Sequence, residues 1–116
     1  MADSLIRLRN ALRAFAAERD WDQFHSPKNL ATALAVEAAE LLEPFQWLTD
    51  EQSRDLPADT RAAVEQELAD VLLYLVRLSD QLGVDLEQAA AAKIARNTEK
   101  YPVDKSRGSS RKYTQL

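Results

Sequence analysis

The apolar positions of this chain recur every three or four residues, the spacing of one face of an α-helix. Four segments have this pattern, and short polar stretches separate them. We expect helices over about residues 4–19, 26–43, 58–82 and 85–100. No segment alternates apolar and polar residues as a half-exposed strand does. The sequence therefore predicts an all-α protein.

Local signals mark where these helices begin and end. Ser26-Pro27 is an N-cap followed by proline at the first helical position. Pro44 disfavours helical geometry in the residue before it, and Gly83 is a typical helix stop. Residues 45–59 are expected to form a connector with a short helical turn.

The length of 116 residues suits one domain, and the mixture of 46% hydrophobic and 29% charged residues is typical of a globular chain. We expect a helical domain over residues 1–102 and a basic tail over residues 103–116. The tail has no apolar face. Its composition favours an unordered end, and the alternative is a basic arm that reaches a phosphate or a neighbouring subunit.

Composition excludes several classes of function. The net charge of −4 argues against binding to nucleic acid or to an anionic membrane. The absence of cysteine excludes disulfides and thiolate catalysis and fits a cytoplasmic protein. The longest apolar run, residues 71–76, is too short to span a bilayer, and the N-terminal segment lacks the apolar core of a secretory signal.

Four carboxylates border the apolar faces of two long helices. Glu37 lies within about 50° of the centre of the apolar stripe on the second helix, and Glu40 follows one turn later. Glu67 and Asp70 repeat this pattern on the third helix. Antiparallel packing of the two helices would bring the four together, where burial and repulsion require compensation. A hard divalent cation, Mg²⁺ or Mn²⁺, suits all-oxygen ligands.

Two other interpretations of these carboxylates are open. Acidic pairs at this spacing are common on solvated helix faces, so each pair by itself is weak evidence for a metal. A di-iron site would need Glu-x-x-His on two helices. The single histidine, His25, lies outside both acidic motifs, which argues against iron.

Glu37-x-x-Glu40, followed after residues 41–66 by Glu67-x-x-Asp70, resembles the metal motif of the MazG-like all-α nucleotide pyrophosphohydrolases. Further segments are similar to the dCTP pyrophosphatase branch of that superfamily. They are AERDWDQFHSPKNLA, FQWLTD, ELADVLLYLVRLSD, VDLEQA, KIARNTEKYP and SSRKYTQL. The ordered set covers nearly the whole chain from about residue 15.

This resemblance implies Mg²⁺-dependent hydrolysis of a deoxynucleoside triphosphate, dCTP or a modified dCTP, to its monophosphate and pyrophosphate, as house-cleaning of the nucleotide pool. It implies that Glu37, Glu40, Glu67 and Asp70 are the metal ligands. Among these four acids we expect Glu40 or Glu37 to act as the base, because their environment can raise a pKa toward neutrality. It also implies a four-helix core and a homotetramer built as a dimer of dimers. The third helix is apolar over more than one face, which independently favours subunit pairing.

The fourth helix and the tail carry candidate contacts to phosphate and sugar. Lys93, Asn97 and Tyr101 recur at a spacing of four and share one helix face. By spacing alone this face could be a solvated edge, whereas the family pattern makes it a substrate contact. Arg111 and Lys112 would add positive charge, from the same or another subunit.

Four residues are candidates for the nucleobase pocket: Trp21, His25, Trp47 and Tyr74. Aromatic residues also commonly serve as plain core or interface packing. The resemblance implies that animal members of the branch carry a cytosine-contacting histidine in the first helix, at the position that matches Leu12 here. Leucine cannot donate a hydrogen bond. Other substrates, dUTP or a damaged dNTP, therefore stay open, as does a non-catalytic helical oligomerisation module.

Overall fold

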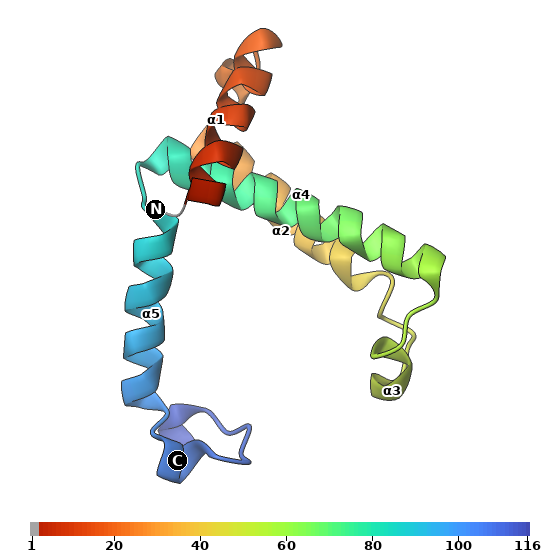
Figure 1. The fold of residues 1–116 in the computed structure, drawn as a ribbon, viewed down its shortest axis with the longest axis vertical. Helices are drawn as coiled ribbons and strands as arrows, with labels where there is room; N and C mark the ends of the chain where they lie inside the picture. The colour runs from red at the N-terminus through yellow and green to blue at the C-terminus, as the bar shows by residue number, and fades with distance from the viewer. Residues whose placement is uncertain (1–2) are drawn as a thin grey trace. The chain divides into compact units, whose positions relative to one another are not determined.

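The structure, a computed structural model, describes residues 3–116. Every regular element in that range is helical (Figure 1), so the predicted all-α class is confirmed. The elements, in chain order, are α1 (Asp3–Glu18), η1 (Asp22–Phe24), α2 (Pro27–Leu42), α3 (Asp50–Ser53), α4 (Ala58–Leu82), α5 (Leu86–Lys100), α6 (Val103–Ser106) and η2 (Tyr113–Gln115).

The described residues form two compact units. The first unit spans residues 3–84 and holds α1 to α4. The second unit spans residues 85–116 and holds α5, α6 and η2. Because α5 belongs to the second unit, three long helices make up the first unit. A core of four helices stays a prediction.

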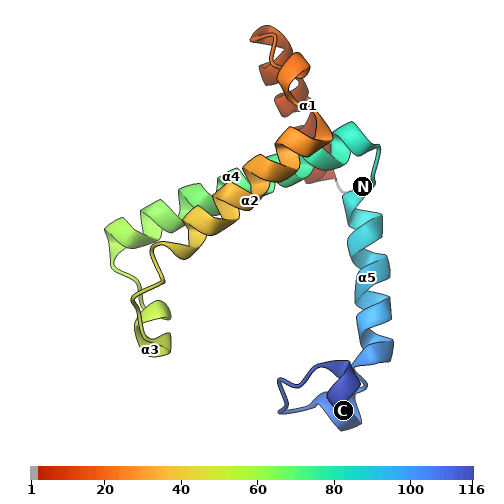
Figure 2. The ribbon, with the colours of Figure 1, turned by 180° about the vertical axis from the view of Figure 1, so that it is seen from behind.

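Within the first unit, α4 is the helix on which the others pack. The helices α2 and α4 lie side by side, and their colour gradients run in opposite directions in both views, so the pair is antiparallel (Figures 1 and 2). The helix α1 also packs on α4. The buried apolar residues come from all three helices: Ala16, Leu30, Val64 and Val76. The seam between α2 and α4 is the place where the predicted carboxylates can meet.

The helix ends follow the local signals in the sequence. The hydroxyl of Ser26 accepts a hydrogen bond from the backbone N–H of Asn29 at 3.2 Å, as an N-cap does. The side chain of Asn29 donates to the carbonyl of Phe24 at 2.9 Å and ties η1 to the start of α2. Gly83 ends α4 with a left-handed φ of 67°. In the connector, Thr49 forms a capping box that starts α3.

The polar composition of residues 103–116 favours an unordered end, but this segment contains α6 and η2. The ring of Tyr113 packs edge to face against Tyr101, with 6.0 Å between centroids. The ammonium group of Lys100 lies 4.8 Å from the centroid of the same ring. These aromatic and cation–π contacts join the predicted tail to the end of α5.

Among residues 3–116, no helix combines the length and the apolar character that crossing a bilayer requires.

Candidate active site

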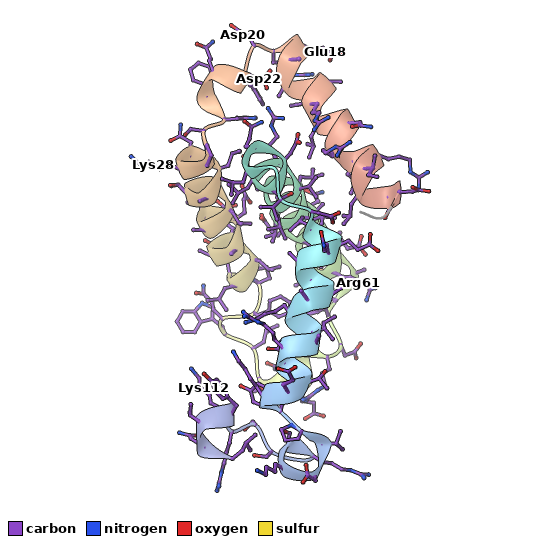
Figure 3. The ribbon with its side chains drawn as sticks, turned by 90° about the vertical axis from the view of Figure 1, so that its left-hand side faces the viewer. Glu18, Asp20, Asp22, Lys28, Arg61 and Lys112 are labelled. Carbon is purple, nitrogen blue, oxygen red and sulfur yellow. The ribbon has the colours of Figure 1, made fainter. Side chains whose placement is uncertain are left out.

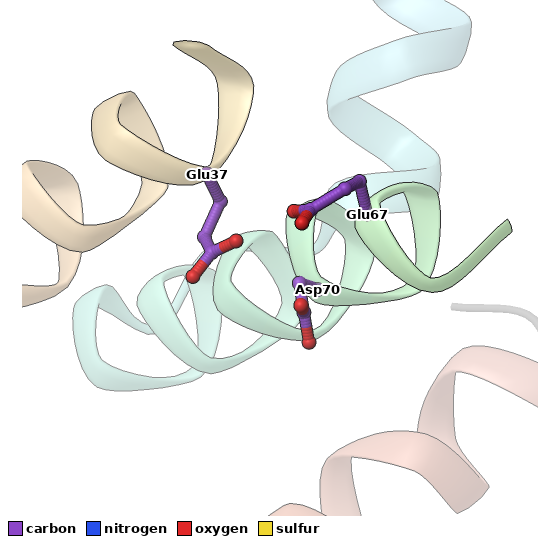
Figure 4. Close-up of side chains that lie close together, drawn as sticks. All are labelled: Glu37, Glu67 and Asp70. Atoms are coloured by element: carbon purple, nitrogen blue, oxygen red, sulfur yellow. The ribbon is translucent and has the colours of Figure 1, made fainter. Parts of the chain in front are cut away.

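Three of the four predicted carboxylates meet at the seam between α2 and α4. Glu37 comes from α2, and Glu67 and Asp70 come from α4, one turn apart. One carboxylate oxygen from each residue lies within 4.8 Å of the others. Figure 4 shows the carboxyl groups of Glu37 and Glu67 pointing toward each other with Asp70 beside them. Glu40, one turn further along α2, is outside this group of three, although its charge acts on Glu37.

The cluster is electrostatically unbalanced. Oε2 of Glu37 and Oε2 of Glu67 are buried and have no hydrogen-bond partner among the described residues. Two ionised carboxylates offer no donor to each other, so they can bond only when one of them holds a proton. A hydrogen bond with Glu67, followed by burial and the neighbouring carboxylates Glu40 and Asp70, raises the pKa of Glu37 to about 7. The metal-free cluster therefore binds a proton near neutral pH.

The same features fit a divalent cation. Every donor in the cluster is a carboxylate oxygen, which hard cations such as magnesium and manganese prefer. A cation would satisfy the two unpartnered buried oxygens and offset the repulsion that raises the pKa of Glu37. Glu37, Glu67 and Asp70 can thus hold a divalent metal. Glu40 is close enough to Glu37 for its charge to affect the pKa of Glu37.

A cavity of about 160 Å³ lies beside the acidic cluster. Three of the residues predicted for a nucleobase pocket, Trp21, His25 and Tyr74, line it. Asp70 also lines the cavity, so the acidic cluster and the cavity share one residue. Leu12 contributes an apolar wall. Because complete ligand pockets are usually about 300–1,000 Å³, this cavity has room for one part of a nucleotide, such as the base.

The turn after α1 positions Trp21 in this cavity. The chain leaves α1 through Asp20, which has a left-handed φ of 54° (Figure 3). The N–H of Trp21 donates to the carbonyl of Ala16 at 2.9 Å, and the N–H of Asp20 donates to that of Ala17 at 3.1 Å, which together form a Schellman motif. The indole then packs edge to face on Phe15, with 5.5 Å between centroids. A helix ending thus fixes one wall of the cavity.

The remaining predicted site residues are not among those that line this cavity. Trp47 is in the connector after α2, is 87% exposed and does not line this cavity. The other five belong to the second unit and stay predictions as substrate contacts. They are Lys93, Asn97 and Tyr101, on and just after α5, and Arg111 and Lys112, just before η2.

Sequence reasoning missed Arg77, which lines the cavity and is only 5% exposed. Its Nε donates to Nδ1 of His25 at 3.1 Å, and its guanidinium also pairs with Asp22 and Asp80. One signal could have identified it, because an arginine directly after the apolar run of residues 71–76 continues the buried face of α4.

Known proteins are similar to this chain in sequence and in fold. A model of the MazG-like family matches residues 32–116. The dCTP pyrophosphatase 1 of Mus musculus is 50% identical over 115 residues, which cover 97% of this chain and 68% of that protein. The Homo sapiens protein of the same name is 48% identical with the same coverage. A crystal structure of a pyrophosphatase from Archaeoglobus fulgidus matches with a TM-score of 0.81 and 37% identity, over 88% of this chain and 95% of that one.

The match to the family model covers most of the chain, and the curated relatives align along nearly all of it. The solved structure extends the likeness to the fold of the helices. The chain therefore belongs to the MazG-like family.

Proposed function

We propose that this protein is a Mg²⁺-dependent nucleoside triphosphate pyrophosphohydrolase that converts dCTP, or a modified dCTP, and water to the monophosphate and pyrophosphate. The observation that carries the proposal is the acidic cluster beside an aromatic cavity of base size, joined through Asp70. Relatives named dCTP pyrophosphatase 1 support the choice of substrate. Removal of unwanted nucleotides from the pool follows as the role of this reaction.

Each carboxylate has a role in this proposal. Glu37, Glu67 and Asp70 would hold the cation. Glu40, one turn further along α2, would be the fourth ligand. When bound, magnesium supplies neutralising charge for the triphosphate as negative charge develops in the transition state. Glu40 or Glu37 accepts the proton of the water that attacks the α-phosphorus, and the bond from that phosphorus to the bridging oxygen breaks as pyrophosphate leaves.

Other residues would bind the substrate. Trp21 and Tyr74 offer aromatic faces to the base in the cavity. Trp47, which is exposed, could close over the base from the connector. The second unit would supply the phosphate and sugar contacts through Lys93, Asn97, Tyr101, Arg111 and Lys112. The last two lie in the segment after residue 102, which we propose acts as a basic tail to the helical domain.

One observation favours a second substrate for the same chemistry. Leu12 lines the cavity and cannot form a hydrogen bond with a base edge. The same reaction on dUTP or on a damaged dNTP would fit such a wall. A non-catalytic oligomerisation module would not explain why two carboxylate oxygens of the acidic cluster are buried without a hydrogen-bond partner.

The substrate is tested by pyrophosphate release from a panel of dNTPs and 5-modified dCTPs, with Mg²⁺, with Mn²⁺ and with EDTA. We expect release from dCTP or a 5-modified dCTP with either metal and none with EDTA. Release from another base would keep the mechanism and change the specificity. Absence of release from every nucleotide would contradict the enzyme.

The role of Glu40 is tested by Glu40→Gln. The amide cannot accept the proton of the attacking water, so we expect turnover to fall by about 10²–10⁴-fold. The matched control is Glu43→Gln, because Glu43 is an exposed acid at the end of the same helix and should leave turnover unchanged. Calorimetric titration with Mg²⁺ then separates a base from a ligand. Turnover close to wild type in Glu40→Gln would remove Glu40 from the site.

The raised pKa of Glu37 predicts a pH dependence of stability. A group whose pKa is higher in the folded state contributes stability that is lost as pH rises through that pKa. We expect the thermal midpoint of metal-free protein to fall between pH 4.5 and about 7. Glu37→Gln should lack this component of the fall, unlike Glu43→Gln, and Mg²⁺ should offset it in the wild type. An identical pH profile for wild type and Glu37→Gln would contradict the assignment.

Exposed leucines on α4 support a homo-oligomer, with a dimer of dimers as our proposal. Leu68, Leu72, Leu75 and Leu82 recur at helical spacing and are 37–56% exposed. Such a stripe is costly in water and marks an interaction surface. We expect light scattering at micromolar concentration to give a tetramer. A monomer would contradict the proposed oligomer.

A further inference from the structure

A buried arginine bonds to the only histidine in the sequence. Nε of Arg77, on α4, donates to Nδ1 of His25, which follows η1, at 3.1 Å. The two residues are 52 positions apart in the chain. Both line the cavity beside the acidic cluster, as do Trp21 and Tyr74. The bond therefore joins the segment after η1 to α4 at the wall of the cavity.

This bond determines which ring nitrogen of His25 carries the hydrogen. A guanidinium is always protonated in proteins and can only donate. Nδ1 of His25 must therefore be the acceptor and hold no hydrogen, and the neutral ring carries its hydrogen on Nε2. Burial lowers the pKa of His25, and the charge of Arg77 lowers it further, although Asp22 opposes them. The neutral ring is thus favoured.

Two ion pairs hold Arg77 in this position. Its guanidinium bonds to Asp22 of η1 (Figure 3). Its Nη1 lies 3.7 Å from the carboxylate of Asp80, on the next turn of α4. Asp80 in turn accepts two hydrogen bonds from Arg13 of α1, at 2.7 and 2.5 Å. Two guanidinium groups thus face two carboxylates. Because its charge is already compensated, Arg77 is suited to positioning His25 rather than to binding a phosphate.

We propose that Arg77 is a positioning residue that fixes His25 as the Nε2–H tautomer, so that the cavity offers a fixed N–H donor to an acceptor on the base. Cytosine presents adjacent acceptors, N3 and O2, whereas uracil and thymine carry a hydrogen on N3. A donor directed at N3 therefore favours cytosine, whereas one directed at O2 would bind cytosine and uracil alike. Bonded to N3, His25 would supply the hydrogen bond that Leu12 cannot form. This inference deepens the proposed function and rests on it for its kinetic consequence.

The tautomer itself is tested by NMR of the full chain labelled with ¹⁵N-histidine, which gives a single imidazole. We expect a protonated Nε2 and an unprotonated Nδ1 in the wild type. Addition of dCMP should shift the Nε2 resonance, and dUMP should shift it less. A hydrogen on Nδ1, or a spectrum unchanged by dCMP, would overturn the proposal whether or not the protein hydrolyses nucleotides.

The positioning role is tested by Arg77→Met, which keeps the length of the side chain and removes its donors. The variant should fold, because Asp80 keeps Arg13 and the side chain of Asp22 is 60% exposed. We expect mixed tautomers of His25. We also expect the ratio of kcat/KM for dCTP to that for dUTP to fall at least about twofold, because a donor present in about half of the molecules halves the apparent affinity, with the change in KM rather than kcat.

The matched control is Arg13→Met, which removes the other guanidinium that bonds to Asp80 but leaves the bond between Arg77 and His25. It should keep both the tautomer and the substrate ratio. An unchanged substrate ratio in folded Arg77→Met would overturn the inference while the proposed function stands. A wild type that hydrolyses no nucleotide would remove the proposed function, and the dCMP titration would then decide the inference alone.

Discussion

Repulsion between carboxylates at the seam of α2 and α4 is the constraint on which the candidate site depends. Antiparallel packing brings Glu37 against Glu67 and Asp70, with oxygens within 4.8 Å of one another. Two of those oxygens are buried without a partner among the described residues. The cluster must therefore take up a proton, which raises the pKa of Glu37 to about 7, or a cation. Binding of a cation would make the acidic cluster useful for phosphate chemistry.

A second charged group in the same unit is balanced instead. Arg77 and Arg13 face Asp22 and Asp80, so this network needs no further ligand. One member of each group, Asp70 and Arg77, lines the same cavity. An unbalanced group suits the binding of a cation, whereas a balanced group suits the orientation of a neighbour such as His25. The proposed division between reaction and base recognition follows from this difference in net charge.

The first unit buries few apolar side chains completely. Leu30 and Val76 are the largest of the fully buried residues, while leucines along α4 stay exposed. Since folding stability depends mainly on apolar area removed from water, these exposed leucines support the homo-oligomer that we propose. Subunit pairing would cover these leucines, so the same apolar contacts would stabilise both the fold and the oligomer.

The sequence alone determined the features that depend on neighbouring residues. Ser26 and Gly83 mark helix ends through hydrogen bonds and φ angles that involve only a few positions. The spacing of Glu37, Glu67 and Asp70 placed them beside apolar stripes, because helical periodicity is local. Family resemblance then connected this spacing with phosphate chemistry.

Only the tertiary structure decided which distant residues meet. It left Glu40 outside the group of three and left Trp47 exposed in the predicted connector. It also joined residues 103–116 to the end of α5 through the contact of Tyr113 with Tyr101. The bond between Arg77 and His25 joins residues 52 positions apart. No local pattern encodes such a contact, because it depends on how the turn after α1 packs against α4.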